Sequence, residues 1–230
     1  MVAMDQDRLT RTRDALHAVA EHVLAADLHR NTGKIGLRPA AGGFATPEYD
    51  ADGARRRLRV DGTDLVVERD GGEVARGPLT TLRAAGDLAG IEPGGPCRVY
   101  ELATPLDLDA PLQPDPAAAE LLADWFALTA DVLERFVAER PHDDATAAQL
   151  WPEHLDLAIQ AGEANYGGSP GDAEHPLPYL YAGPWRPPTG DGWNEPFGAS
   201  IPWRGDLTVD EAVAFLVERR DACAEIRARR

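Results

Sequence analysis

The stretch LRVDGTDLVVERDGGEVAR, residues 58–76, decides the fold of the first half of the chain. Leu58 and Val60 alternate with arginines, and two further runs follow at residues 65–68 and 73–76, separated by Asp-Gly pairs. Asp-Gly between apolar runs is a strong hairpin signal, because glycine adopts a positive φ without a steric penalty. The stretch therefore predicts an antiparallel meander of three strands.

Amphipathic helices are expected on both sides of this meander. Apolar residues spaced three, four and seven apart predict a helix over residues 7–28. Pro78 leads into a short helix over residues 79–89, which Gly90 ends. Residues 103–116 carry four prolines and predict a connector.

Two more helices are expected in the second half. Asp115 caps and Pro116 opens a helix that runs up to Pro141, since the missing N–H of proline is not needed at the first helical position. Thr208 and Glu211 form a capping box at the start of the last helix. Further strands are expected at residues 97–102 and 149–160.

Together these elements predict an α+β fold, in which antiparallel sheet packs against about four main helices. The order helix, strands, helix occurs twice along the chain. Residues 1–230 are therefore expected to form one globular unit, and two related halves, 5–103 and 112–228, are an open alternative.

Composition and charge exclude several partners. The chain has 39 acidic and 23 basic residues, a formal charge of −16, so we expect no nucleic-acid partner, because phosphate binding needs a basic surface. No apolar run approaches the roughly 20 residues that cross a bilayer. With a polar start of the chain, this predicts a cytoplasmic protein without a membrane partner.

The cysteines and arginines are interpreted as structural. Cys97 and Cys223 are both expected in the core, and their spacing argues against a disulfide framework or a cysteine metal site. Lys34 is the only lysine among the 23 basic residues, so the positive groups are guanidinium forks suited to pairing with carboxylates.

The segment 162–205 is rich in glycine, proline and aromatic residues. Aromatic side chains bury large areas, which favours an ordered, irregular structure over a flexible linker. We expect a ligand pocket here, with packing that closes the open end of a sheet as the alternative. The expected lining residues are Tyr166, Tyr179, Tyr181, Trp185 and Trp193.

Histidine and aspartate residues surround this segment. On a strand over residues 149–160, His154 and Asp156 share one face, with Cα atoms about 6.6 Å apart. Asp172 and His175 follow in a loop. These four side chains suit a divalent metal site, or an acid/base site with His154, Asp156 and His175 as catalytic groups. Structural hydrogen bonding and ligand hydrogen bonding, the latter also from Asn165, are the alternatives.

A second polar stripe lies on the first helix. Asp14, His17 and Glu21 share one line of the helix away from its apolar face, and His22 and His29 lie nearby. We interpret this stripe as solvated surface.

Standard nucleotide and hydrolase motifs are not found. Lys34 lacks the glycine six positions before it and the Ser or Thr after it that a phosphate loop requires, and no Gly-x-Gly-x-x-Gly opens a helix. Ser169 precedes Pro170, which has no N–H to offer an oxyanion, so this turn is not a nucleophile elbow.

Several strings resemble a family of bacterial proteins of unknown function. They are LWPEH at 150–154, YGGSPGD at 166–172, HPLPYLY at 175–181 and WNEPFG at 193–198, and the likeness spans nearly the whole chain. The resemblance implies one unit of about this length and no particular activity.

The expected function is binding of a small molecule in the aromatic-lined pocket of the C-terminal half, with an enzymatic role left open. The alternative is a non-catalytic interaction module whose exposed aromatic loops dock a partner protein or a second copy of the chain, as a homo-oligomer.

Overall fold

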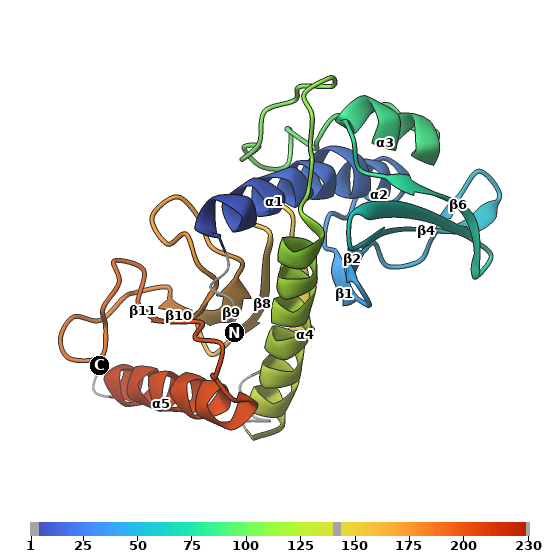
Figure 1. The fold of residues 1–230 in the computed structure, drawn as a ribbon. Helices are drawn as coiled ribbons and strands as arrows, with labels where there is room; N and C mark the ends of the chain where they lie inside the picture. Colours follow the sequence, from blue (N-terminus) through green and yellow to red (C-terminus); the bar gives the residue numbers. More distant parts are fainter. Residues whose placement is uncertain (1–4, 140–143, 229–230) are drawn as a thin grey trace. The chain divides into compact units, whose positions relative to one another are not determined.

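The computed structural model describes residues 5–139 and 144–228, which divide into two compact units (Figure 1). The first unit is Met1–Phe126 with Leu150–Leu155, and the second is Ala127–Gln149 with Asp156–Arg230. The division falls inside helix α4 (Pro116–Glu139) and not in the proline-rich connector. Helices and antiparallel sheet in the described residues confirm the α+β class.

The three-stranded meander is confirmed in the first unit. It consists of β4 (Ala54–Asp61), β5 (Asp64–Arg69) and β6 (Gly72–Pro78). Asp70 and Gly71 have φ values of 50° and 80°, which is the pair of positive φ angles that a type I′ hairpin requires. The sheet order is β1-β2-β4-β5-β6, and the further strands are β1 (Arg38–Ala40), β2 (Gly43–Ala45) and β3 (Tyr49–Ala51), the last paired to β4.

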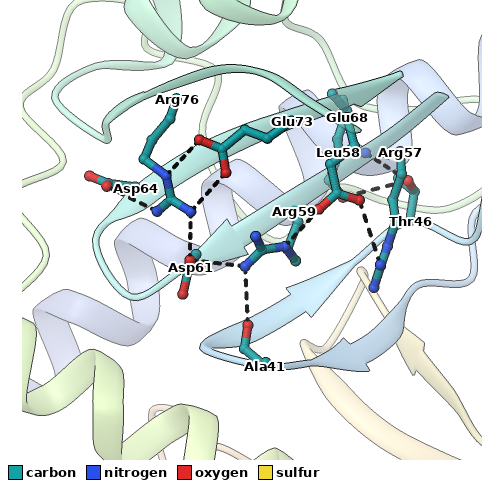
Figure 2. A network of polar contacts seen from close by, with 10 residues as sticks. All are labelled: Ala41, Thr46, Arg57, Leu58, Arg59, Asp61, Asp64, Glu68, Glu73 and Arg76. Carbon is teal, nitrogen blue, oxygen red and sulfur yellow. Dashed lines mark hydrogen bonds and ion pairs between the residues drawn. The ribbon is translucent and has the colours of Figure 1, made fainter. Parts of the chain in front are cut away.

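One face of this meander carries the paired arginines (Figure 2). Arg59 lies 3.0 Å from Asp61 and 3.1 Å from Glu68, and Arg76 lies 2.9 Å from Asp61. The hydrogen bond from Arg76, together with one from Arg59, lowers the pKa of Asp61. The apolar residues that alternate with these side chains, among them Leu58 and Val60, are fully buried. The structural interpretation of the arginines therefore holds on this face.

The first predicted helix is longer than expected and contains a wide turn. It comprises α1 (Gln6–Val19), a π-helical turn η1 (Ala20–Ala25) and α2 (Ala26–Thr32). The short helix is α3 (Leu82–Ala89), capped by the Thr81 side chain and ended by Gly90 in the left-handed conformation. α3 packs on β5 and β6.

The caps predicted for the last two helices are confirmed. The carboxylate of Asp115 accepts hydrogen bonds from the N–H groups of Ala117 and Ala118 at the start of α4. At the start of α5 (Val209–Ala228), Glu211 accepts from the Thr208 N–H at 2.9 Å.

The second unit contains an antiparallel sheet in the order β11-β10-β9-β8, with α5 in contact with β10. Tyr166 of β9 and its cross-strand neighbour Ala182 of β10 share the face that packs toward α4, where the Tyr166 ring lies 4.8 Å from that of Phe136. The strands are β8 (Asp156–Ala161), β9 (Ala164–Ser169), β10 (Tyr179–Pro184) and β11 (Ala199–Pro202).

One predicted strand is wrong, and another is interrupted by a turn. Residues 97–102 form turns and bends, and Cys97 is exposed rather than in the core, whereas Cys223 is buried as expected. The expected strand 149–160 is interrupted: β7 (Gln149–Trp151) ends before Pro152, and residues 152–155 form a turn. Proline cannot donate to a strand ladder, and Leu155 has a φ of 52°, which a strand does not allow.

Among the described residues, no helix is both long and apolar enough to span a membrane.

Candidate functional site

The predicted site residues fall in different units. His154 belongs to the first unit, and Asp156, Asp172 and His175 belong to the second. His154 is exposed within the turn that interrupts the expected strand, so it does not share a strand face with Asp156. The predicted convergence of His154 with His175 stays a prediction.

Within the second unit, one face of the sheet gathers hydroxyl and carboxylate groups. Gly167 and Tyr181 are cross-strand partners on this face, which is opposite to that of Tyr166. The Tyr181 hydroxyl donates a hydrogen bond to the carboxylate of buried Asp156. A Cβ atom on Gly167 would lie 2.9 Å from the Tyr181 hydroxyl, so the absence of a side chain there makes room for this pair.

A tight turn places a second tyrosine and a histidine beside this pair. The Asp172 carboxylate accepts hydrogen bonds from the backbone N–H groups of Glu174 and His175 at 2.8 and 2.7 Å. It also accepts from the Tyr179 hydroxyl at 2.8 Å. Asp172 therefore orders the loop that carries His175. Although burial opposes it, these hydrogen bonds lower the pKa of the Asp172 carboxyl.

Two residues that the sequence did not single out complete the arrangement. Glu195 lies with its carboxylate 3.1 Å from Nε2 of His175, and it accepts a hydrogen bond from the Ser200 hydroxyl at 2.6 Å. The side chain of Asn194 pairs with the backbone of Ser200 at 3.0 and 3.2 Å. The only feature of the sequence that could have indicated these two residues is their position in the Trp193-Asn194-Glu195 run, inside the aromatic segment 162–205.

An ionised carboxylate only accepts hydrogen bonds, so Nε2 of His175 must carry the proton shared with Glu195. Nδ1 of the same ring lies 3.6 Å from the Asp172 carboxylate, which is too long for a hydrogen bond. Nδ1 therefore makes no hydrogen bond to Asp172, and 30% of the His175 side chain is exposed.

The predicted aromatic lining separates into different places. Tyr179, Tyr181 and Phe197 have ring centroids 6.3 to 6.4 Å apart, the distance of aromatic rings that pack on one another. Tyr166 faces Phe136 on the other side of the sheet. These rings therefore pack on both faces of the sheet and do not line one common pocket.

Trp185 and Asn165 lie at the other end of their strands, and Trp193 contacts an arginine. Trp185 is 58% exposed and follows the end of β10 opposite to Tyr179, about 20 Å along the strand. The Arg219 guanidinium lies over the Trp193 ring, 5.4 Å from its centroid. Asn165 is exposed at the turn-side end of β9, where Gln160 donates to its side-chain oxygen at 3.5 Å.

Across the two described ranges, no group of three or more His, Cys, Asp or Glu side chains is arranged to hold a metal ion.

The interpretation of the polar stripe of the first helix as solvated surface holds for Asp14, which is exposed, and is wrong for Glu21. Glu21 and His22 lie in the π-helical turn and are fully buried. The Glu21 carboxylate accepts hydrogen bonds from the N–H groups of Ala103 and Thr104 at 3.0 and 2.8 Å, and from the Thr104 hydroxyl. π-helical turns inside α-helices frequently occur at functional sites.

His22 holds the same irregular segment at a second point. Its Nδ1 accepts a hydrogen bond from the Gly95 N–H at 3.1 Å, and its Nε2 lies 3.1 Å from the carbonyl oxygen of Thr104. The amide is a donor and the carbonyl an acceptor, so the ring proton is on Nε2. Glu21 and His22 together connect the segment 94–104 to the helix through hydrogen bonds.

Half-buried His17 lies close to this region. Its Nε2 is 2.7 Å from the carbonyl oxygen of Pro152, and burial lowers the pKa of its imidazole.

Four of the five tyrosines should stay protonated in the folded protein at pH 11. Burial first, and then a neighbouring carboxylate, raises the pKa of Tyr49, Tyr100, Tyr179 and Tyr181. An unfolded phenol with a pKa of about 10 is about nine-tenths ionised at pH 11. The unfolded chain then binds fewer protons than the folded one, so stability is full below about pH 10 and falls as the pH rises further.

Absorbance at 295 nm, with circular dichroism to follow folding, tests this expectation. A full phenolate signal at pH 11 from a chain that is still folded would contradict it. A matched titration in denaturant supplies the signal of all five tyrosines.

No protein-family model matches the chain, and searches of curated proteins and of solved structures find nothing similar to it.

Proposed function

We propose that the second unit binds a small polar molecule at the sheet face that carries Tyr179 and Tyr181, with His175 as the central polar group. The observation that supports this most is the continuous hydrogen-bonded series from Tyr179 through Asp172 and the His175 loop to Glu195 and Ser200. Such a series holds an imidazole in one orientation before any ligand arrives.

The chemistry of this group follows from its partners. Glu195 orients the His175 ring through Nε2, so Nδ1 can accept a proton or a hydrogen bond from a hydroxyl or ammonium group of the ligand. Tyr179 and Phe197 supply an apolar floor beside the ring, with centroids 4.9 and 6.5 Å from that of His175. This arrangement favours a ligand with a polar group on an apolar or sugar-like body, and an acid/base role is compatible with it.

A thermal-shift panel of sugars, sugar acids, amino acids and nucleosides tests the proposal. A ligand at about ten times its Kd stabilises the folded state by about 1.4 kcal/mol, which raises the Tm of a chain of this size by about 3–5 °C. We expect His175→Ala to abolish this rise and His29→Ala, in the first unit, to preserve it. A rise that survives His175→Ala, or a panel without any hit, would contradict the proposal.

A third variant tests the predicted convergence of the two histidines. If His154→Ala also abolishes the ligand-induced rise, His154 takes part in the same site. If the rise persists, the site consists of residues of the second unit alone.

The alternative, an interaction module, is favoured by the 58% exposure of Trp185. Docking through Trp185 would be lost in Trp185→Ala and would be insensitive to His175→Ala, which distinguishes the two functions. A cytoplasmic location is supported by two cysteines that are both free, and the net charge of −16 continues to argue against nucleic acid as a partner.

A further inference from the structure

A second group of polar side chains gathers in the first unit, around the π-helical turn. Glu21 is fully buried there, and its carboxylate accepts hydrogen bonds from residues 103–104. His17 lies four residues before Glu21 on the same helix, and its Nε2 is 2.7 Å from the carbonyl oxygen of Pro152. This contact places the turn that carries Glu153 beside the helix, within the same unit.

Two polar atoms near this turn are buried and have no hydrogen-bond partner in the part of the chain that the structure describes. They are the hydroxyl oxygen of Tyr100 and Oε2 of Glu153. Burial, followed by the charges of Glu21 and Glu153, raises the pKa of Tyr100, so its phenol is neutral and lies near both carboxylates. Buried polar atoms are nearly always paired, so two unpaired ones at one place indicate a missing partner.

Glu21 has acceptor capacity left as well. An ionised carboxylate offers about four lone-pair sites. Oε2 of Glu21 accepts from the N–H and the hydroxyl of Thr104, whereas Oε1 accepts from the N–H of Ala103. Among the hydrogen bonds of the described residues, this leaves one site on Oε1. The missing partner can therefore meet three acceptors, on Glu21, Tyr100 and Glu153.

The two carboxylates lack a counter-charge. Neither Glu21 nor Glu153 forms an ion pair with an arginine or lysine among the described residues. His22 is neutral, because its Nδ1 accepts one hydrogen bond while its Nε2 carries the proton. Burial also lowers the pKa of His17, so this imidazole supplies no positive charge near neutral pH. A buried negative charge is unfavourable without a positive partner, so the missing partner is a cation.

These acceptors suit a cation that donates hydrogen bonds. Among the described residues, no third His, Cys, Asp or Glu is arranged with the two glutamates to hold a metal ion. We propose that Glu21, Tyr100 and Glu153 bind a primary ammonium group, which is either the ammonium ion or the end of a small amine. Its N–H groups donate to the two carboxylates and to the phenol oxygen. The proposal is independent of the function proposed for the His175 site.

Four chloride salts, titrated into the full chain at neutral pH and equal ionic strength, test the proposal. They are ammonium, methylammonium, potassium and tetramethylammonium chloride. The amide NMR signals of residues 103–104 are followed, because these N–H groups donate to Glu21. We expect saturable shifts with ammonium or methylammonium, and binding at least about tenfold weaker for the two cations that have no N–H to donate. The tighter of the two binders identifies the source of the group as the free ion or an amine.

Variants that remove one acceptor at a time should weaken the binding. Glu153→Gln keeps the shape of the side chain but removes its charge, and we expect a loss of affinity of about tenfold or more. Tyr100→Phe removes the hydroxyl and should cost about threefold to tenfold. Glu92→Gln changes an exposed carboxylate of the same unit and is the matched control, with unchanged affinity expected. Dispersed signals of the same amides show that each variant is folded.

Three outcomes would overturn the proposal. They are the absence of a saturable shift with both ammonium and methylammonium, equal binding of potassium, and equal weakening by Glu153→Gln and Glu92→Gln. The first would mean that water or a shared proton satisfies the buried atoms. The second would mean that hydrogen-bond donation is not recognised, and the third that the overall negative charge of the protein attracts the cation.

Discussion

Replacing Arg56 by alanine is expected to destabilise the first unit by about 3–5 kcal/mol, because it leaves a buried carboxylate without its counter-charge. Arg56 and Asp27 are almost completely buried, and Nε of Arg56 lies 2.9 Å from the Asp27 carboxylate. The Tyr49 hydroxyl donates to the same carboxylate at 2.6 Å, and Asn31 donates to it at 3.0 Å. These neutral donors cannot replace a guanidinium in a site that excludes water.

Arg55 is the matched control for this change. It is the neighbouring residue of β4, but 52% of its side chain is exposed and its ion pairs with Glu48 and Asp50 are 3.4 and 3.6 Å long. Arg55→Ala should therefore change stability by no more than about 0.5–1 kcal/mol. Hydrogen exchange of the β4 and α2 amides, together with urea unfolding, measures both effects in the unit concerned.

A double variant separates the charge from the packing. Asp27→Leu combined with Arg56→Met removes both charges together, and we expect it to be less destabilising than Arg56→Ala alone. If Arg56→Ala and Arg55→Ala lower stability equally, the buried pair does not have the role assigned to it.

Replacing Glu21 by alanine is expected to lower the free energy of unfolding by about 3 kcal/mol, because it removes a fully buried carboxylate that accepts three hydrogen bonds. The N–H groups of Ala103 and Thr104 and the Thr104 hydroxyl all donate to this carboxylate. His22 would still hold Gly95, so the loss should be largest at residues 103–104. Faster hydrogen exchange at these two amides, with a lower free energy of unfolding, is the expected result.

Asp7 is the control on the same helix. Its side chain is exposed, and Asp7→Ala should change stability by no more than about 0.5–1 kcal/mol. If the hydrogen-exchange protection of the amides of residues 103–104 is unchanged in Glu21→Ala, the Glu21 carboxylate does not hold this segment.

The parts of the fold that could be predicted are those that local chemistry determines. Asp70-Gly71 specifies its hairpin because two adjacent residues with positive φ are needed there. Thr208 and Glu211 specify the start of α5 because their side chains satisfy its first N–H groups. The strand predicted at 97–102, which the structure does not contain, had no local turn or cap signal. An apolar residue gives the same sequence pattern whether it lies in a strand or in a packed loop.

The candidate site was predicted in part for the same reason. Asp172 and His175 are three residues apart and meet in one turn. Tyr179 and Tyr181 lie two apart on one strand, with rings 6.3 Å from each other. Glu195 reaches His175 from 20 positions further along the chain, and no local spacing indicates that contact.

The sequence alone therefore determined the α+β class, the meander, the helix caps and the pairing of arginines with carboxylates on the outer face of β4. Tertiary structure alone decided that Glu21 and His22 are buried and that Glu195 joins His175. It also decided that the predicted aromatic residues occupy both faces of a sheet. The physical reason is the distance along the chain over which each effect acts. Turn and cap preferences act over two to four residues, whereas the burial of a side chain depends on which distant segment covers it.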